Sequence, residues 1–186
     1  MSNAEEGFRP LFDGRTLAGW DVVRDTWESW EMQDGMVVCN GAGRGWIRTE
    51  RMYRDFLLRL EFAISPQGNS GVFLRSLTEG RPAYNGMEVQ ILDDHGAPPT
   101  TTCTGALYDA IAPAKNVMRP AWEWNELEAS CLSTRVRLVL NGEHIVDVDL
   151  DEHEATRGRP REGYIGLQNH HSAVRFRRVR VREVQP

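Results

Sequence analysis

The sequence of 186 residues lacks several features that would assign it to a specialised class of protein. No apolar run approaches the roughly 18 residues that a membrane-spanning helix needs, so no span is predicted. No low-complexity segment interrupts the chain, in which 40% of the residues are hydrophobic and 26% are charged. The net charge of −5 gives no bulk attraction for nucleic acid. A packed globular protein that recognises its ligand through a local site is therefore expected.

Cysteine is also scarce, because only Cys39, Cys103 and Cys131 are present and they are widely spaced. No CxxC pair exists, so neither a zinc ribbon nor a dithiol redox site is indicated. One disulfide would agree with the count. Buried free thiols are the favoured interpretation, because Cys is among the residue types most often buried.

The start of the chain shows neither the basic region nor the apolar region of a secretion signal. Residues 1–7 are predicted to be a tail, in which Ser2-Asn3-Ala4 could be a cloning scar that replaced a native leader. Residues 8–186 are predicted to form one domain, since no repeat or linker divides them. These observations leave the localisation open.

Alternating apolar residues predict β-strands along most of the chain. In residues 55–64, for example, Phe56, Leu58 and Phe62 share one face. Only residues 151–160 carry a helical stripe. Many short strands separated by turns rich in Gly, Asn and Pro indicate an all-β sandwich or barrel. Further strands are predicted at residues 70–76, 87–92, 135–140, 143–150, 163–169 and 173–184.

The last predicted strand changes its alternation part of the way along. Val174 and Phe176 share one parity, whereas Val179 and Val181 have the other. A β-bulge at residues 177–178 would return all four apolar side chains to one face. The arginines of this strand would then form an exposed stripe. A nucleic-acid surface is not favoured there, because the chain is acidic overall and no stacking aromatics are interleaved.

Two other motifs only superficially suggest chemistry. Residues 41–46, GAGRGW, fit neither a dinucleotide fingerprint nor a P-loop, and are predicted to be a flexible turn. Asp147, Asp149 and Asp151 alternate as cation ligands could. They lack the Gly and the final Glu of an EF-hand loop, so a solvated strand edge is favoured.

Three of the predicted strands carry unusual side chains opposite their apolar faces. If these strands lie in one sheet, the polar faces form the wall of a cleft. Long hydrogen-bonding side chains with aromatics nearby suit a sugar, which offers hydroxyls and apolar ring faces. A merely solvated face is the alternative, but Gly166 leaves room for a ligand to approach. The residues of this face are Phe73, Arg75, Glu88, Gln90, Gly166, Gln168 and His170.

The same residues carry a resemblance that covers nearly the whole chain. The segments that carry it, in chain order, are LFDGRTLAGW (11–20), GNSGVFLRS (68–76), GMEVQILDD (86–94), TGALYDAIAP (104–113), WNELEASC (124–131), LNGEHIVD (140–147) and GYIGLQNHHSAVRFRRVRV (163–181). Together they resemble the 3-keto-disaccharide hydrolase domain family. The resemblance implies a concanavalin A-like jelly roll of two antiparallel sheets, with the ligand site on the concave face.

The activity that the resemblance implies is cleavage of glycosides already oxidised to a ketone at C3 of the sugar. Some similar domains bind sugars without catalysis, so a non-catalytic carbohydrate-binding module is the alternative. Proteins similar to this one are usually exported or periplasmic. An ordinary glycosidase is disfavoured, because the proposed face has only one suitable carboxylate, Glu88.

A C3 ketone acidifies the C2 proton, so cleavage needs a base, a donor to the enolate oxygen and an acid for the leaving group. Glu88 is predicted to be the base. Arg75 is placed to orient it or to bind the developing oxyanion. His170 is the candidate acid, or the base if Glu88 only orients, because its pKa lies near neutrality.

The remaining aromatic and amide side chains are predicted to bind the substrate, a small carbohydrate. Gln90, Gln168 and Tyr108 would hold hydroxyl groups, while Trp124 would stack on the sugar ring and Phe73 would contribute to the same face.

A divalent cation such as calcium is the one cofactor that the sequence raises. Asp93 and Asp94 could coordinate it, so that the cation polarises the ketone. A turn after the strand explains the same pair and is favoured, so no metal ligand is assigned. The oligomeric state stays open.

Overall fold

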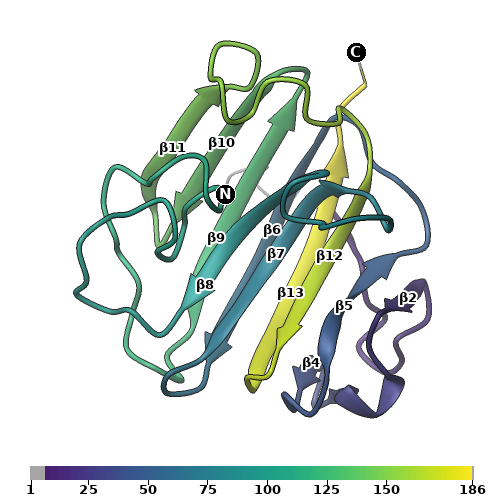
Figure 1. Ribbon diagram of the computed structural model, residues 1–186. Helices are drawn as coiled ribbons and strands as arrows, with labels where there is room; N and C mark the ends of the chain where they lie inside the picture. Colours follow the sequence, from purple (N-terminus) through teal and green to yellow (C-terminus); the bar gives the residue numbers. More distant parts are fainter. Residues whose placement is uncertain (1–6, 186) are drawn as a thin grey trace.

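The computed structural model describes residues 7–185 and shows two antiparallel β-sheets packed face to face (Figure 1). Nearly all of the predicted tail, residues 1–6, lies outside the described residues. The eight-stranded sheet has the order β11-β10-β9-β6-β13-β4-β3, with β1 paired to β13. The five-stranded sheet has the order β2-β5-β12-β7-β8. The all-β jelly-roll prediction is confirmed.

The strands of the eight-stranded sheet are β1 (Arg9–Pro10), β3 (Trp30–Gln33), β4 (Met36–Cys39), β6 (Phe56–Ile64), β9 (Asn125–Leu132), β10 (Arg135–Leu140), β11 (Glu143–Asp149) and β13 (Val174–Glu183). Those of the five-stranded sheet are β2 (Trp20–Val23), β5 (Arg44–Thr49), β7 (Asn69–Ser76), β8 (Met87–Leu92) and β12 (Tyr164–His170). A single 3-10 turn, η1 (Trp27–Ser29), lies between β2 and β3.

All seven strands predicted from alternation are present, as β6, β7, β8, β10, β11, β12 and β13. The prediction of a turn at residues 41–46 was wrong for its second half, since β5 begins at Arg44. The strands β2, β3 and β4 escaped prediction because four residues give too few alternations, and the eight-residue β9 was also missed. Residues 151–160, which carry the helical stripe, form turns.

The core lies between the two sheets and is built from the apolar parity of each strand. Leu58 and Phe176 of the eight-stranded sheet are fully buried, as are Val72 and Leu167 of the five-stranded sheet. Each such side chain contributes roughly 1.5–3 kcal/mol through burial. Truncating Phe176 to Ala would cost about 3–5 kcal/mol. Because the apolar side chains of the five-stranded sheet point into this core, the polar side chains that alternate with them point outward.

The bulge predicted in β13 is confirmed. Arg177 pairs with Glu61 and Arg180 with Arg59, so β13 holds one more residue than β6 between these pairs. Arg178 takes up the extra residue with φ +50°. As a result Val174, Phe176, Val179 and Val181 all point inward, with at most 4% of each exposed.

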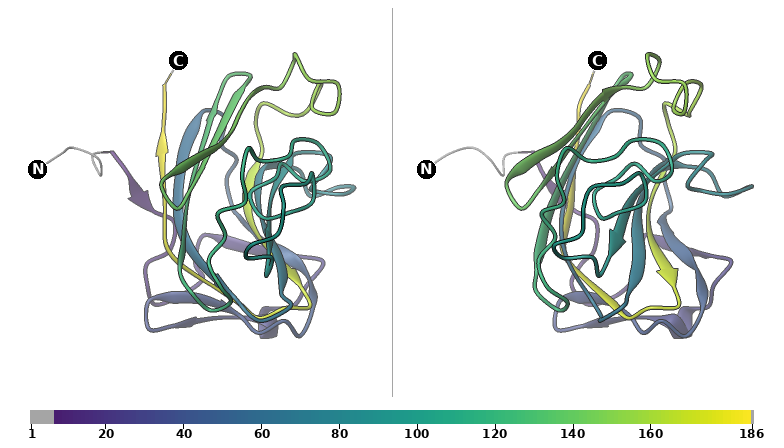
Figure 2. Two further views of the ribbon diagram at one scale, coloured as in Figure 1. Left: turned by 90° about the vertical axis from the view of Figure 1, so that its left-hand side faces the viewer. Right: turned by 60° about the vertical axis from the view of Figure 1, so that its left-hand side comes forward.

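A long excursion over residues 93–124 closes the side of the sandwich between β8 and β11 (Figures 1 and 2). It touches both edges through backbone bonds, because Tyr108 N–H donates to Glu88 O and Ala114 N–H donates to Ile145 O. The excursion ends where β9 begins at Asn125.

The three cysteines are free and buried, which confirms the favoured interpretation. Burial raises the pKa of Cys39 and of Cys131 to about 12, so both remain inert thiols at neutral pH. The described residues form no helix with the length and apolar character that crossing a bilayer requires.

Candidate functional site

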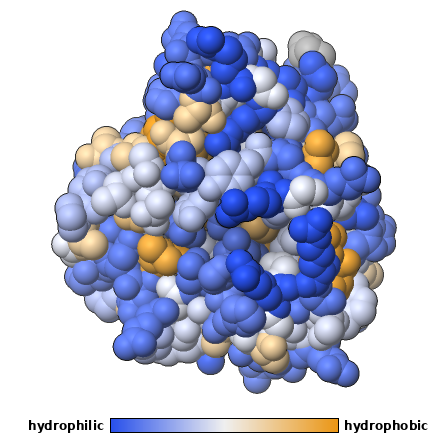
Figure 3. Space-filling model, viewed as in Figure 1, coloured by the Kyte–Doolittle hydropathy of each residue, from blue (hydrophilic) through white to orange (hydrophobic). Residues whose placement is uncertain are grey.

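The three strands predicted to share a polar face are neighbours in the five-stranded sheet. Gly166 of β12 lies opposite Phe73 of β7, which in turn lies opposite Glu88 of β8. Their outward side chains and the loops around them enclose a cavity of about 430 Å³, within the range typical of small-molecule sites. Figure 3 shows strongly hydrophilic residues around a hollow on this face of the molecule.

The cavity contains six of the eight predicted site residues. They are Phe73, Glu88, Gln90, Tyr108, Gln168 and His170. It also contains residues that the sequence interpretation did not select, namely Arg24, Arg44, Gly45, Trp46, Asn69, Arg81, Pro82, Ala83 and Asn169.

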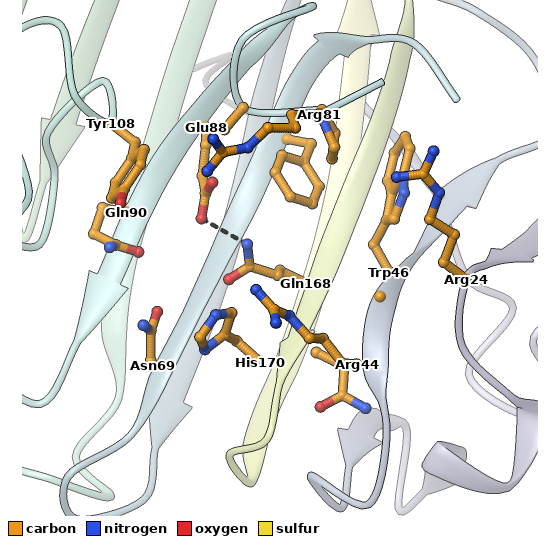
Figure 4. Close-up of a pocket in the computed structure, with 15 residues that line it drawn as sticks. Arg24, Arg44, Trp46, Asn69, Arg81, Glu88, Gln90, Tyr108, Gln168 and His170 are labelled. Carbon is orange, nitrogen blue, oxygen red and sulfur yellow. Dashed lines mark hydrogen bonds between the residues drawn. The ribbon is translucent and has the colours of Figure 1, made fainter. Parts of the chain in front are cut away.

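Glu88 is the only carboxylate among the described residues that line the cavity. Its side chain is nearly buried, at 4% exposed, and Gln168 Nε2 donates to Glu88 Oε1 at 2.8 Å (Figure 4). The carboxyl lies over Gly71, where a Cβ atom would come within 2.4 Å of Oε1. Burial raises the pKa of Glu88 to about 8, although Gln168 and the Arg81 guanidinium oppose this. At pH 7 this carboxyl group is therefore mostly protonated.

His170 shows the opposite tendency. Partial burial lowers the pKa of this imidazole, and the neighbouring Arg44 guanidinium lowers it further. The ring is therefore neutral at pH 7, with a lone pair that can accept a proton. A neutral imidazole and a protonated carboxyl group thus line the same cavity (Figure 4).

Amide side chains give the cavity its hydrogen-bonding capacity. Gln168 Oε1 is buried and has no hydrogen-bond donor within the described part of the chain. A buried acceptor without a donor is costly, so a ligand hydroxyl that donates to it would be favoured. Asn69 and Gln90 line the cavity beside it (Figure 4).

The free edge of β8 is covered by residues 105–108, which explains the position of Tyr108. Gly105 N–H donates to Gln90 O at 2.9 Å, and Gln90 N–H donates to Ala106 O at 3.0 Å. Tyr108 N–H donates to Glu88 O at 2.9 Å, so the tyrosine follows the wall that carries Glu88. Its ring is placed by main-chain bonds.

Trp46 and Phe73 form an apolar floor at one end of the cavity, together with Ala83. Their ring centroids are 5.0 Å apart and the rings meet edge to face. Trp46 lies over Gly166, where a Cβ atom would come within 2.2 Å of the indole. The space that Gly166 provides is thus filled by an indole from β5.

Three exposed arginines surround the cavity, from different segments: Arg24 after β2, Arg44 at the start of β5 and Arg81 in the loop before β8. None of the ion pairs within residues 7–185 involves these three side chains. Alternation within RGWIRT would have placed Arg44 and Trp46 on one face, had the segment been interpreted as a strand.

Arg75 is not in the cavity, so its predicted role beside Glu88 was wrong. Between Phe73 and Ser76, β7 contains one residue more than β12, and Arg75 has φ +51°. This bulge turns the side chain away from the cleft face. The fully buried guanidinium donates to Arg54 O, Ser133 O and Asp55 Oδ1, and so links the two sheets.

Trp124 was also placed wrongly by the sequence. Its ring lies beneath the guanidinium of Arg177, at 3.9 Å from carbon to ring centroid. Arg177 belongs to β13 and has the parity opposite to the buried Phe176, so both lie on the outer face of the eight-stranded sheet. Trp124 follows a loop whose course could not be predicted from alternation.

Asp93 and Asp94 behave as turn residues. Asp93 Oδ2 accepts from Gln67 N–H at 2.9 Å, and Asp94 Oδ2 accepts from Thr104 N–H at 2.8 Å. Among residues 7–185, no group of three or more His, Cys, Asp or Glu side chains is arranged to hold a metal ion. The bonds of both aspartates fit the turn interpretation.

Comparison with known proteins extends these observations. The family model of the 3-keto-alpha-glucoside-1,2-lyase-like domain matches residues 7–182. A Bacteroides thetaiotaomicron protein named 3-keto-disaccharide hydrolase is 26% identical over 227 aligned positions, which cover 95% of this chain and 78% of that protein.

Solved structures show the same fold. One from Parabacteroides distasonis, assigned provisionally as a glycosyl hydrolase, has a TM-score of 0.87 at 24% identity and covers 100% of this chain and 98% of its own. A carbohydrate-binding module of Bacillus subtilis has a TM-score of 0.64 at 18% identity, covering 89% and 96%. Because the family model spans almost every described residue, the chain belongs to the 3-keto-alpha-glucoside-1,2-lyase-like domain family.

Proposed function

We propose that this protein cleaves the glycosidic bond of sugars that carry a ketone at C3. The observation that carries the proposal is the pairing of one buried, protonated carboxyl group with one neutral imidazole in a sugar-sized cavity. Membership of the family and the name of the Bacteroides relative support the same activity.

An ordinary glycosidase would need a different arrangement. Retaining and inverting enzymes use two carboxyl groups on either side of the scissile bond. Glu88 is the only one among the described lining residues. A 3-keto sugar removes this need, because its ketone makes the C2–H bond acidic enough for a single base.

The residues of the cavity suit an elimination. His170 takes the C2 proton, and the electrons of that bond move to the C3 oxygen as an enolate. Arg44, whose positive charge lowers the pKa of the neighbouring His170, stabilises the enolate charge. The enolate collapses to form the C1=C2 bond, the C1–O bond breaks and Glu88 gives its proton to the leaving oxygen. The products are an alcohol and an unsaturated 3-keto sugar. If water then adds across the double bond, with the hydroxyl at C1 and the proton at C2, the free 3-keto sugar forms.

This assignment reverses the roles expected from the sequence, in which Glu88 was the base. The reason is electrostatic. Burial makes ionised Glu88 unfavourable, and burial together with the Arg44 charge makes ionised His170 unfavourable, so each group rests in the form suited to the opposite task.

The first experiment measures product release from 3-keto-trehalose and from unoxidised trehalose, with and without a chelator. Cleavage of the keto sugar alone is the expected result. Cleavage of both sugars, or of neither, would overturn the proposal. Loss of activity with the chelator would instead bring a divalent cation, with Asp93 and Asp94 as its first candidates, into the reaction.

A pH–rate profile of the His170→Asn variant distinguishes the two assignments of Glu88, because in the wild type an acid–base pair gives the same bell-shaped profile whichever member holds the proton. In this variant, residual kcat/KM falls as the pH rises through about 8 if Glu88 is the acid, because the proton is lost, and rises over the same range if Glu88 is the base. Adding Glu88→Gln removes this pH dependence in either case.

A non-catalytic carbohydrate-binding module is the second candidate, favoured by the fold shared with the Bacillus module. Titration calorimetry with the keto sugar and the unoxidised sugar separates the two. A binding module would hold both sugars without turnover, and Glu88→Gln would change only the affinity.

A further inference from the structure

The cavity has two ends with different chemistry (Figure 4). One end is polar, with Asn69, Gln90 and Gln168 close to His170 and the neighbouring Arg44. The other end has the apolar floor of Trp46, Phe73 and Ala83, with Arg24 and Arg81 at its rim. A sugar with several hydroxyl groups fits the first end. The second end suits a ligand group that is apolar on its body and anionic at its periphery.

The charge of this cavity is opposite to that of the chain. Its lining carries three arginines, whereas the single carboxyl group, Glu88, keeps its proton at neutral pH because burial raises its pKa to about 8. The cavity is therefore cationic in a protein of net charge −5. Several arginines elsewhere pair with acids, as Arg48 does with Asp21 at 2.7 Å.

The rim is held in place before any ligand arrives. Arg24 Nη1 donates to Gly80 O at 2.9 Å, so it reaches the residue next to Arg81. Arg81 lies over the ring of Tyr84, at 4.6 Å from carbon to centroid. Arg159, which is nearly buried, donates from Nη1 to Ala83 O and to Gly86 O at 3.0 Å each. These bonds fix the loop that carries Arg81, so little ordering remains to be done on binding.

The elimination needs one cation, and Arg44 beside His170 supplies it. Arg24 is therefore not explained by the chemistry at C2 and C3. Arg81 lies beside Glu88 and lowers its pKa, so it borders both ends of the cavity, whereas Arg24 lies on the far side of Trp46 from Glu88 (Figure 4).

We propose that the end of the cavity formed by Trp46, Phe73, Arg24 and Arg81 binds the leaving group, and that this group carries an anionic substituent such as a carboxylate. The assignment rests on the proposed function, since it divides the cavity between the keto sugar and the group it loses. Guanidinium binds carboxylates with two parallel charge-assisted hydrogen bonds, which a neutral leaving group cannot form.

The test compares two 3-keto-glucosides that differ only in charge. One carries 4-hydroxyphenylacetate and the other 4-hydroxyphenylacetamide, so the charge is remote from the phenolic oxygen that leaves. The expected result is a kcat/KM about tenfold higher for the carboxylate, a preference that shrinks as salt is added. Arg24→Glu should abolish this preference. Arg15→Glu, an exposed arginine in the turn before β2, makes the same change in net charge and should leave it intact.

The outcomes separate the two proposals. Equal kcat/KM for both glucosides would overturn the anionic leaving group while leaving 3-keto-glycoside cleavage in place. If neither glucoside is cleaved, the proposed function fails, and calorimetry with the two free phenols decides the charge preference alone. Tighter binding of 4-hydroxyphenylacetate that Arg24→Glu removes would support it, and equal or undetectable binding of the two phenols would overturn it.

Discussion

Glu61 and Glu88 lie on the outer faces of opposite sheets, and both are nearly buried, at 7% and 4% exposed. Glu61 accepts hydrogen bonds from Arg177 and Arg178 at 2.6 and 2.8 Å. Glu88 is bonded to a neutral amide, Gln168, instead. Both faces are rich in arginine and tryptophan. The comparison teaches that residue type does not distinguish a structural surface from a binding surface. What differs is whether the acidic side chain is paired with arginines, as Glu61 is, or has no cationic hydrogen-bond partner among the described side chains, as for Glu88.

The largest expected effect concerns the burial of Glu88. Because its folded-state pKa of about 8 exceeds the ordinary 4.5, the folded protein binds the proton more tightly than the unfolded chain does. Stability is therefore full below pH 4.5 and falls as the pH rises to 8, by up to about 5 kcal/mol. Glu88→Gln removes this loss, so denaturant titrations should show the variant gaining on the wild type from pH 5 to 8.5. Exposed Glu31→Gln serves as the control, and equal gains from both would refute the prediction.

The second effect comes from breaking a buried ion pair that lies on neither of these two faces. Arg75→Met removes the guanidinium that pairs with Asp55 and breaks the three hydrogen bonds that it donates. This should cost about 3–5 kcal/mol of unfolding free energy. Turnover per folded molecule should be unchanged. Arg81→Met, at the cavity rim, should alter stability by less than about 0.5 kcal/mol. A fall in the kcat of folded Arg75→Met would return that residue to the reaction.

The third effect fills the space under the indole. In Gly166→Ala the new methyl group would collide with Trp46, so the ring must move into the cavity. Overpacking of this kind costs about 1–3 kcal/mol and should weaken ligand binding. Thermal melts and calorimetry measure the two effects. Ser130→Ala, on β9 of the other sheet, should change neither, and undiminished affinity in Gly166→Ala would argue against Trp46 as part of the site.

The smallest effect comes from the paired carboxylate. Glu61→Gln leaves Arg177 and Arg178 without their acceptor, but these side chains are 35% and 69% exposed and water can replace it. A loss of about 1 kcal/mol is expected, with no change in turnover. Activity that falls with Glu61→Gln would erase the distinction between the two faces.

The local pattern of the sequence was enough for most of the fold. Period-two alternation found seven of the nine strands with at least six residues, and the parity change in β13 located its bulge. Alternation failed where strands were short, as in β2 to β4, where glycine disguised β5 as a turn, and in β9, whose inward face includes the small residues Ala129 and Cys131. These elements are stabilised by neighbours far away in the sequence, which no local pattern reveals.

The site divides in the same way. Glu88, Gln90, Gln168 and His170 belong to regular strands, so parity placed them correctly. Arg75 defeats parity because an extra residue precedes Ser76 and turns it away. The positions of Trp124, Arg24 and Arg81 depend on loops, whose course is decided by tertiary contacts.

The strap of residues 105–108 along β8 has a consequence for how other macromolecules meet this protein. Its bonds to Glu88 and Gln90 occupy the main-chain groups of a strand that borders the cavity. A peptide that extends a sheet needs such groups unoccupied, and so do neighbouring copies that aggregate edge to edge. The strand that carries Glu88 is thereby closed to pairing with another chain along this edge, while the hollow beside it stays open to ligands.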